Sequence, residues 1–396
     1  MRITSITSVP YVYQLRRLIG DVNLPAGADQ GFDAAVFVRT DEDVTGMSVA
    51  PAAAAFAIGR LEGLLLGMDP RSVRACFDKM LAMAFKAGNS GPVSAGISAI
   101  DRALWDLRAK INGVPLWKEL GAADNRVPVY ASGLDTPLSD EELHAFYAGM
   151  AARGVSVGKL KVGRSPDDDL RRLGVLVDAL GSAGGRPQVI IDANEYWSPK
   201  QAIQRITALE REYDFVWVEE PVRRWDYDGL RRVSEGIRAP VATGENINAL
   251  NEYVPLLTQQ AVDVVQISSH TTGITGARAV AELAEAFARP VTMGNDPGRG
   301  MAHLAAALAH HTVMEVFDVG RDAALVNPPP IRDGCVVLNE DPGSGVVFDL
   351  DYLESHRADR LPGRSLAGSY VRAPDAGLVG VHEVGVHGEV SRHGSS

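Results

Sequence analysis

Three acidic residues stand at the ends of three successive apolar segments. Asp192 ends the run Val-Ile-Ile-Asp, Glu219 ends Val-Trp-Val-Glu, and Glu245 ends Ala-Thr-Gly-Glu. The intervals between them are 27 and 26 residues, about the length of one strand, one helix and two loops. Side chains at the C-terminal ends of neighbouring parallel strands meet at one face of a barrel or sheet. The spacing therefore predicts that three carboxylates converge on one site.

Three converging carboxylates would repel one another unless a cation lay among them or one kept its proton. A set of oxygen ligands suits Mg²⁺ better than Zn²⁺. We therefore expect Asp192, Glu219 and Glu245 to bind one Mg²⁺, the alternative being three unrelated surface carboxylates. Glu220 should face away from Glu219, because side chains alternate along a strand.

Two lysines, Lys159 and Lys161, end an earlier apolar segment, and Lys161 precedes Asp192 by 31 residues. Residues two apart on a strand face the same side. A useful general base needs a pKa that falls from ~10.4 toward 7–8. Burial, a second ammonium group and a nearby metal would all lower the pKa of a lysine. The pair predicts a lysine base beside the metal, unless both side chains are solvated.

Eight short β-branched segments alternate with amphipathic helical segments over the middle of the chain. Such runs, apolar without strict alternation, are typical of strands buried on both faces, and hence of parallel strands. Eight units favour a closed (β/α)8-type barrel, a modified TIM barrel, over the alternative of an open doubly wound sheet. The last crossovers are short, so a final helix is not clearly indicated. The eight segments are Val127–Ala131, Val157–Val162, Val189–Ala193, Phe215–Glu219, Val241–Gly244, Val262–Ile267, Val291–Gly294 and Val313–Phe317.

The regions on either side of the barrel have a different character. Residues 1–125 combine strand-like segments with a long helix whose apolar residues recur every three or four positions between Ala95 and Ile111. Gly113 should end that helix. We expect an α+β capping domain over 1–125, completed by residues 350–396, and a barrel domain over 126–349. The histidines of the tail, at positions 382, 387 and 393, are more typical of a polar tail than of a metal site.

Composition narrows the possible functions. The chain has 396 residues, two cysteines and a formal net charge of −11. The negative charge argues against nucleic-acid binding, and an anionic substrate would need a local cation. No apolar run approaches the ~18 residues of a membrane span. We expect a cytoplasmic protein that acts on a small molecule, away from membranes.

In this order, these motifs closely resemble those of the enolase superfamily, in particular its mandelate racemase/muconate lactonizing enzyme group. The carrying motifs are Lys-x-Lys at 159–161, Asp-Ala-Asn at 192–194, Glu-Glu-Pro at 219–221, Gly-Glu-Asn at 244–246, the helix over 95–121 and Asp-Pro-Gly-Ser-Gly at 341–345. The resemblance covers nearly the whole chain. It implies that Mg²⁺ binds a substrate carboxylate while a base removes the proton on the adjacent carbon, giving an enediolate. By analogy Lys161 is the base, Lys159 assists it, and Asn194 and Asn246 orient metal ligands.

The chain departs from the group where a second catalytic residue would stand. Racemase-type members carry an Asp after the sixth strand and a His after the seventh, and other members carry a Lys after the sixth. Here His270 follows the sixth strand, while Asn295 and Asp296 follow the seventh. His270 and Asp296 are the candidates for a second acid or base, with loop and helix-capping roles as the alternatives. Three residues are candidates for substrate binding: Asn295, Glu315 on the eighth strand, and Arg299.

The capping region departs from the group as well. Many members have Gly-Trp-Gly-Glu where this chain has Gly-Met-Ser-Val at 46–49. The loop Leu18–Phe32 is expected to close over the site.

A single clear base favours dehydration of a hydroxy acid or sugar acid to a 2-keto acid, since a syn elimination can reuse the same lysine as the acid. The alternatives are a racemase, epimerase or cycloisomerase of the same superfamily, or a non-catalytic metal-binding relative. The resemblance also implies an even-numbered homo-oligomer.

Overall fold

The computed structural model describes residues 1–268, 273–294, 298, 300–358 and 376–377. The chain starts with an antiparallel sheet of β1 (Ile3–Ile19), β2 (Ala28–Thr40) and β3 (Thr45–Pro51). The short helix η1 (Ala52–Ala54) leads into α1 (Ala55–Leu65), α2 (Val73–Met83), α3 (Gly91–Ile111) and α4 (Leu116–Glu119). Apolar side chains of the sheet and of α1, α2 and α3 form one core. The α+β character expected for this region is confirmed.

Helix α3 matches the predicted periodicity and is buried along most of its length. Arg108 and Lys110 lie in its last turn, where positive charge favours the helix dipole. Gly113 then adopts φ 68°, a conformation in which a side chain would be strained. The helix therefore ends where the sequence indicates.

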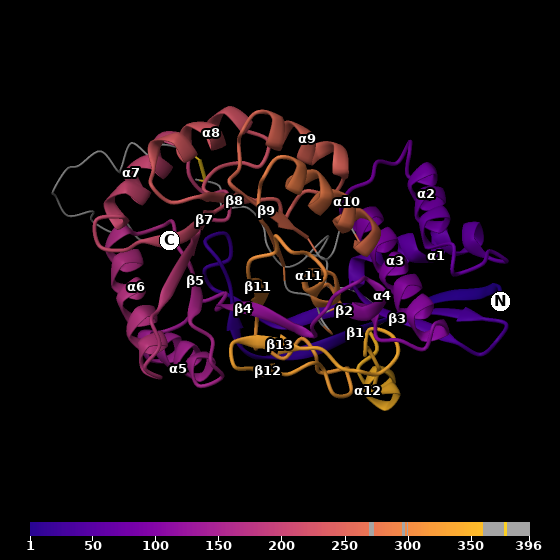
Figure 1. The fold of residues 1–396 in the computed structure, drawn as a ribbon. Helices are drawn as coiled ribbons and strands as arrows, with labels where there is room; N and C mark the ends of the chain where they lie inside the picture. Colours follow the sequence, from indigo (N-terminus) through magenta and orange to yellow (C-terminus); the bar gives the residue numbers. More distant parts are fainter. Residues whose placement is uncertain (269–272, 295–297, 299, 359–375, 378–396) are drawn as a thin grey trace, which may run out of the picture.

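Eight parallel strands form the barrel in the predicted order. Each strand pairs with the next along the chain from β4 to β10, and β4 also pairs with β11, which excludes the open sheet. Backbone hydrogen bonds between Val291 and residues 310 and 312 join β10 to the segment before β11. The strands are β4 (Arg126–Ser132), β5 (Val157–Lys161), β6 (Gln188–Asp192), β7 (Phe215–Glu219), β8 (Val241–Thr243), β9 (Val264–Ile267), β10 (Val291–Met293) and β11 (Met314–Val316). Figure 1 shows the ring of strands surrounded by helices.

Seven helices alternate with these strands in the part of the chain that the structure describes. Several begin at serine caps: Ser139 and Ser198 each form a capping box with a residue three positions on. After β11 the chain forms a small hairpin, β12 (Ile331–Arg332) and β13 (Cys335–Val337), and β13 pairs with β4. The helices are α5 (Asp140–Ala151), α6 (Pro166–Gly181), α7 (Pro199–Leu209), α8 (Tyr227–Gly236), α9 (Leu250–Thr258), α10 (Gly273–Ala286) and α11 (Ala302–Ala306).

The interior of the barrel is apolar at one end. Tyr130 and Trp217 meet edge to face with ring centroids 5.5 Å apart, within a small cluster of buried apolar residues from successive strands. The C-terminal strand ends carry the charged residues instead. The barrel therefore has a packed floor and a polar mouth.

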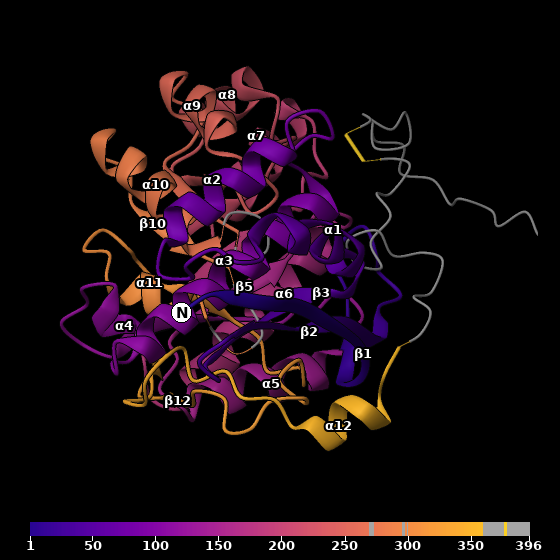
Figure 2. The same cartoon turned by 90° about the vertical axis from the view of Figure 1, so that its right-hand side faces the viewer.

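The C-terminal segment returns to the capping sheet. Helix α12 (Leu350–Ser355) is followed by a bridge between Arg357 and Tyr11 of β1. Val12 donates a backbone hydrogen bond to His356, and Ala358 donates one to Pro10. Figure 2 shows α12 beside the end of this sheet.

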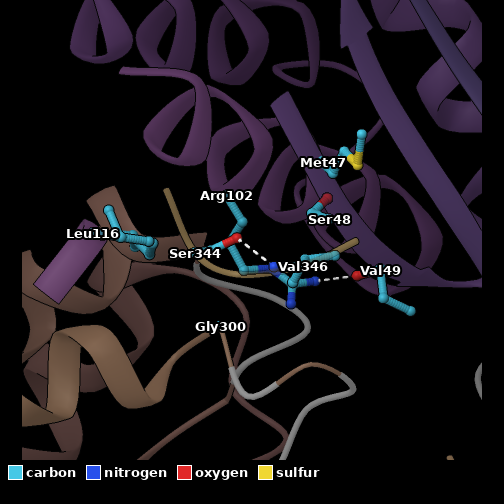
Figure 3. Close-up of a pocket in the computed structure, with 9 residues that line it drawn as sticks. Met47, Ser48, Val49, Arg102, Leu116, Gly300, Ser344 and Val346 are labelled. Carbon is cyan, nitrogen blue, oxygen red and sulfur yellow. Dashed lines mark hydrogen bonds between the residues drawn. The ribbon is translucent and has the colours of Figure 1, made fainter. Parts of the chain in front are cut away.

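Asp106 connects helix α3 to strand β3 and to the C-terminal segment by hydrogen bonds. Its buried carboxylate accepts hydrogen bonds from the backbone N–H of Met47 at 2.8 Å, from Lys110 at 2.6 Å, and from the N–H and hydroxyl of Ser344. A cavity of about 10 Å³ lies close by, lined by Ser48, Arg102 and other residues of β3, α3 and the C-terminal segment (Figure 3). That volume holds about one water molecule, so this cavity is not a substrate site.

No helix of the described residues is both long enough and apolar enough to cross a membrane.

Candidate active site

Strand register brings the lysine pair and two of the acidic residues together. Lys161 of β5 lies opposite Asp192 of β6, and Asp192 lies opposite Glu219 of β7. The Lys161 ammonium donates to Asp192 Oδ2 at 2.5 Å. Lys159 Nζ lies 2.5 Å from Glu219 Oε1, 3.2 Å from Asp192 Oδ2 and 2.7 Å from Glu315 Oε1 of β11. All five side chains are buried at the mouth of the barrel.

Glu245 and Glu220 extend this group of charges. Glu245 follows β8 and is half-buried, close enough for the charges of Lys159 and Lys161 to act on it. Glu220 has φ 41°, a left-handed backbone conformation that a β-strand does not contain. The alternation of side chains along β7 therefore stops before Glu220 and does not determine the direction of its carboxylate. Glu220 is buried, and its burial and then the charge of Glu245 raise its pKa. The expectation that Glu220 faces away rested on alternation, which the left-handed backbone interrupts.

The electrostatic environment of the two lysines differs from the expected one. Desolvation is the largest influence and lowers the pKa of Lys161, but Asp192 and Glu245 more than offset it, so its pKa is raised. The pKa of Lys159 is also raised, because Glu219 and Glu315 outweigh its desolvation. Carboxylates in contact with the ammonium groups favour the charged form. A low lysine pKa at this site requires those carboxylates to be engaged by another cation.

The pKa values of the buried carboxylates show that the two lysines only partly neutralise them. Burial raises the pKa of Glu219, and the neighbouring Asp192 raises it further. Burial likewise raises the pKa of Glu220 and of Glu245. The pKa of Asp192 is lowered, since Lys161 and Lys159 together outweigh the opposing effect of its burial. Four carboxylates, those of Asp192, Glu219, Glu245 and Glu315, therefore share the two ammonium groups of Lys159 and Lys161.

This donor set fits a hard divalent cation. Asp192, Glu219 and Glu245 offer oxygen ligands on three successive strand ends, and a cation would relieve their mutual repulsion. In the present arrangement Glu219 and Asp192 pair with the ammonium groups of Lys159 and Lys161. Among the described residues no group of three or more acidic, histidine or cysteine side chains, these carboxylates included, is already gathered as a metal site.

Two asparagines contact the acidic residues. The backbone N–H of Asn194 donates to Asp192 Oδ1 at 2.9 Å, and its side chain lies 3.4 Å from Asp192 Oδ2. Asn246 Nδ2 donates to Glu220 Oε1 at 2.9 Å and lies 3.3 Å from Glu245 Oε1. Asn194 has φ 43°, a backbone conformation that asparagine tolerates better than most residues. Both side chains are placed where they can hold carboxylates in position.

Sequence reasoning missed Asp135, which supports the lysine strand. This fully buried carboxylate pairs with Arg172 of α6 at 2.8 Å and accepts from the backbone N–H of Lys161 at 3.2 Å. Tyr147 of α5 also donates to it at 2.9 Å and to the carbonyl of Lys159. Asp135 lies in an irregular loop after β4, so no periodicity marks it, and its partners are distant in sequence.

Several predicted site residues lie outside the described residues. They are His270, Asn295, Asp296 and Arg299. The histidines at 382, 387 and 393, which were expected to belong to a polar tail, also lie outside the described residues. Of the predicted substrate-binding residues, Glu315 lies within the structure and contacts Lys159.

Family models match both the N-terminal and the C-terminal part of the chain. The model of the mandelate racemase/muconate lactonizing enzyme N-terminal domain matches residues 32–121. The model described as enolase C-terminal domain-like matches residues 142–352, more than half of the chain. The chain belongs to the mandelate racemase/muconate lactonizing enzyme group of the enolase superfamily.

Relatives in this superfamily catalyse different reactions. The chain is 35% identical over 300 residues to a 3,6-anhydro-alpha-L-galactonate cycloisomerase from Streptomyces coelicolor, covering 74% of this chain and 80% of that one. It is 34% identical over 213 residues to the L-talarate/galactarate dehydratase of Salmonella typhimurium, about half of each chain. A racemase structure from Streptomyces coelicolor with bound magnesium has a TM-score of 0.82 and 29% identity, covering 90% of this chain and all of that one.

The group thus comprises lyases and isomerases, and this superfamily member is an enzyme of those classes. The alternative of a non-catalytic relative is not supported.

Proposed function

We propose that this enzyme uses Mg²⁺ to remove the proton next to a substrate carboxylate, and that it dehydrates a hydroxy or sugar acid to a 2-keto acid. The observation that carries this proposal is the contact of Lys161 with Asp192, in a row that continues to Glu219. A proton acceptor thus lies beside the oxygen donors that suit the metal.

Asp192, Glu219 and Glu245 would hold the Mg²⁺, with Asn194 and Asn246 positioning these carboxylates. When bound, the metal would attract the substrate carboxylate and stabilise the negative charge that develops as the proton leaves. Engaging the carboxylates would also remove the interactions that hold the pKa of Lys161 high. The lysine could then act as a base near neutral pH.

The remaining residues would position the substrate and move its protons. Lys161 removes the proton on the carbon next to the carboxylate and returns it to the departing hydroxyl, which leaves as water. The resulting enol rearranges to the 2-keto acid. Lys159 and Glu315, in contact at 2.7 Å, would face the same reacting end of the substrate.

A racemase or epimerase is the second candidate, favoured by the similarity to a solved racemase. This reaction delivers a proton from the face opposite Lys161, and His270 and Asp296 are the residues we propose for that role. Asn295 and Arg299 would then bind substrate. A cycloisomerase, the activity of the relative at 35% identity, would share the proton-removal step.

Incubation with Mg²⁺ and a panel of sugar acids and dipeptides in deuterated water tests these proposals. Formation of a 2-keto acid supports dehydration. Starting material with deuterium on the carbon next to the carboxylate and inverted configuration supports the racemase instead. If no acid in a broad panel exchanged its proton or reacted, the proposed half-reaction would be refuted.

A further inference from the structure

Strand β5 continues past the end of its neighbour β4, and Lys161 lies on this extension. The final pair between the two strands joins Ser132 to Lys159. On the other side, Lys161 still lies opposite Asp192 of β6. In a parallel strand the backbone groups of successive residues point alternately to the two neighbouring strands. Val162 donates to the carbonyl of Asp192 at 2.9 Å, so the backbone groups of Lys161 point the other way, to the side where β4 has ended.

Three side chains take the place of β4 at this point and hydrogen-bond to the lysine backbone. Asp135 Oδ1 accepts from the N–H of Lys161 at 3.2 Å, and Arg172 Nη1 of α6 donates to the carbonyl of Lys161 at 3.2 Å. The hydroxyl of Tyr147 in α5 donates to the carbonyl of Lys159. A buried backbone group without a partner is costly, so these contacts stabilise the extended end of β5.

The same three side chains also fix one another. Arg172 Nη2 donates to the Asp135 carboxylate at 2.8 Å and to the backbone carbonyl of Asp135 at 2.6 Å. The hydroxyl of Tyr147 lies 2.9 Å from Asp135 Oδ2. All three residues are buried. The rigid fork of an arginine restricts the geometry of its carboxylate partner, so the group has little freedom to move.

Two glycines leave the room that these side chains need. A Cβ at Gly133, just after β4, would lie 2.5 Å from Asp135 Oδ2 and 2.9 Å from the hydroxyl oxygen of Tyr147. A Cβ at Gly158 of β5 would lie 3.1 Å from the ring of Tyr147. A larger residue at either position would push Tyr147 or Asp135 away from the lysine strand. The local backbone is therefore adapted to this group of contacts.

We propose that Asp135, Tyr147 and Arg172 are positioning residues for proton removal, which hold the backbone of Lys161 so that its amine meets the substrate at the correct distance. This inference rests on the proposed function. A displacement of about 1 Å in an active site can lower a rate by about 10²-fold. The contacts reach the backbone of the lysines, so substitution of the three residues keeps the pairs between the ammonium groups and the carboxylates of the site.

The test compares two substitutions in this group with a matched control. Tyr147→Phe removes one hydroxyl and keeps the ring. Asp135→Asn keeps an oxygen that can accept from the N–H of Lys161 but removes the charge that pairs with Arg172. The control Tyr11→Phe removes an equally buried hydroxyl from β1 of the capping sheet. Amide hydrogen exchange over residues 157–162, followed by mass spectrometry, measures how firmly the strand end is held.

Exchange over residues 157–162 should become about tenfold or more faster in Tyr147→Phe and Asp135→Asn, and should not change in Tyr11→Phe. Turnover is then followed as deuterium exchange at the carbon next to the carboxylate of an acid that the wild type accepts. The rate is expressed per Mg²⁺-binding site, so that unfolded protein does not count. Both variants should lose about tenfold or more in kcat, with KM and the dissociation constant of Mg²⁺ within about twofold of the wild type.

Unchanged amide exchange over residues 157–162 in both variants would overturn the inference. So would a loosened strand with unchanged kcat per site, because the three residues would then serve stability alone. A rise in KM with kcat unchanged would also overturn it by assigning them to substrate binding. If the wild type exchanges no proton of any acid, the proposed function fails, whereas faster amide exchange in the variants would still show that these side chains hold the lysine strand.

Discussion

At the scale of single residues, the proposed chemistry depends on Lys161 losing its proton. Replacing it with alanine should lower the rate of proton removal by about 10²–10⁴-fold, the usual contribution of a general base. Lys161→Arg should be equally inactive, since arginine keeps the charge beside Asp192 but does not release a proton. Deuterium exchange measures this rate. Lys118→Ala, which removes an exposed lysine paired with Glu340, should stay active.

A thermal melt of each variant separates loss of chemistry from loss of fold. Lys161→Arg keeps a positive partner for Asp192 and should melt near the wild type, whereas Lys161→Ala leaves that buried carboxylate with less compensation. Full exchange activity in a folded Lys161→Arg protein would contradict the assignment of this lysine as the base.

The excess of carboxylates makes a second prediction at this scale. Adding Mg²⁺ to chelator-treated protein should raise the melting temperature, because a ligand that binds the folded state stabilises it by about 2.7 kcal/mol at a hundredfold excess over the dissociation constant. Glu245→Gln should weaken this shift by removing one charged ligand. The exposed Glu340→Gln provides a charge-matched control. A melting temperature that did not respond to Mg²⁺ would argue against the metal site.

At the scale of elements, the cap helix α3 secures the start of the barrel helix α10. Asp101 of α3 accepts from the backbone N–H of Thr275 at 2.9 Å and from its hydroxyl at 2.5 Å. Ser98, one turn earlier, accepts from the N–H of Gly273 at 3.0 Å. Gly273 has φ 63°, and a Cβ there would lie 2.6 Å from the Asp101 carboxylate. A helix of the capping region thus supplies hydrogen-bond acceptors to the N-terminus of a helix 174 residues further along the chain.

This contact predicts a pH dependence of stability. Burial raises the pKa of Asp101 to about 7, while Thr275 and Arg102 partly oppose that effect. Between about pH 4 and 7 the folded protein keeps a proton that the unfolded chain releases. The stability that this group contributes is therefore lost as the pH rises through 7. Asp101→Asn should flatten the change in melting temperature between pH 5 and 8.

Asp169 offers a comparison for the same measurement. Burial raises its pKa to about 7 as well, and it accepts from the backbone N–H of Gly163 at 3.0 Å. Asp169→Asn should flatten the profile to a similar degree. A profile that neither substitution changed would show that these carboxyls do not control stability in this range.

Asp101→Ala leaves the start of α10 without its hydrogen-bond acceptor, so it should lower the free energy of unfolding by about 1–3 kcal/mol.

At the scale of the whole molecule, the capping region and barrel meet around the site. The contacts of α12 and residues 356–358 with β1 support a capping unit of residues 1–125 completed by the segment after 350, over a barrel of 126–349. We propose this division. It places the loop between β1 and β2, which hydrogen-bonds to the segments after β4, β5 and β6, on one unit and the two lysines on the other.

The net charge of −11 gives a prediction for the molecule as a whole. An anionic substrate approaches against this field, and salt screens charges beyond about 10 Å at 0.1 M ionic strength. Raising NaCl from 10 to 150 mM should therefore lower KM for a monocarboxylate, with kcat little changed. Steady-state kinetics at fixed Mg²⁺ would check this. A KM that rose steeply with salt would indicate that local attraction dominates the approach.

Local patterns in the sequence were enough to indicate the eight strands, the long cap helix and the acidic strand ends. These features repeat at strand or helix spacing, and parallel register follows from chain order, which is why Lys161, Asp192 and Glu219 could be placed in one site. Contacts between distant segments were decided only by the tertiary structure. Glu220 adopts a left-handed backbone conformation, and Asp135 contacts the lysine strand from an irregular loop. Whether the pKa of each lysine is raised or lowered depends on how many buried carboxylates surround its ammonium group. That number cannot be read from the spacing of residues along the chain.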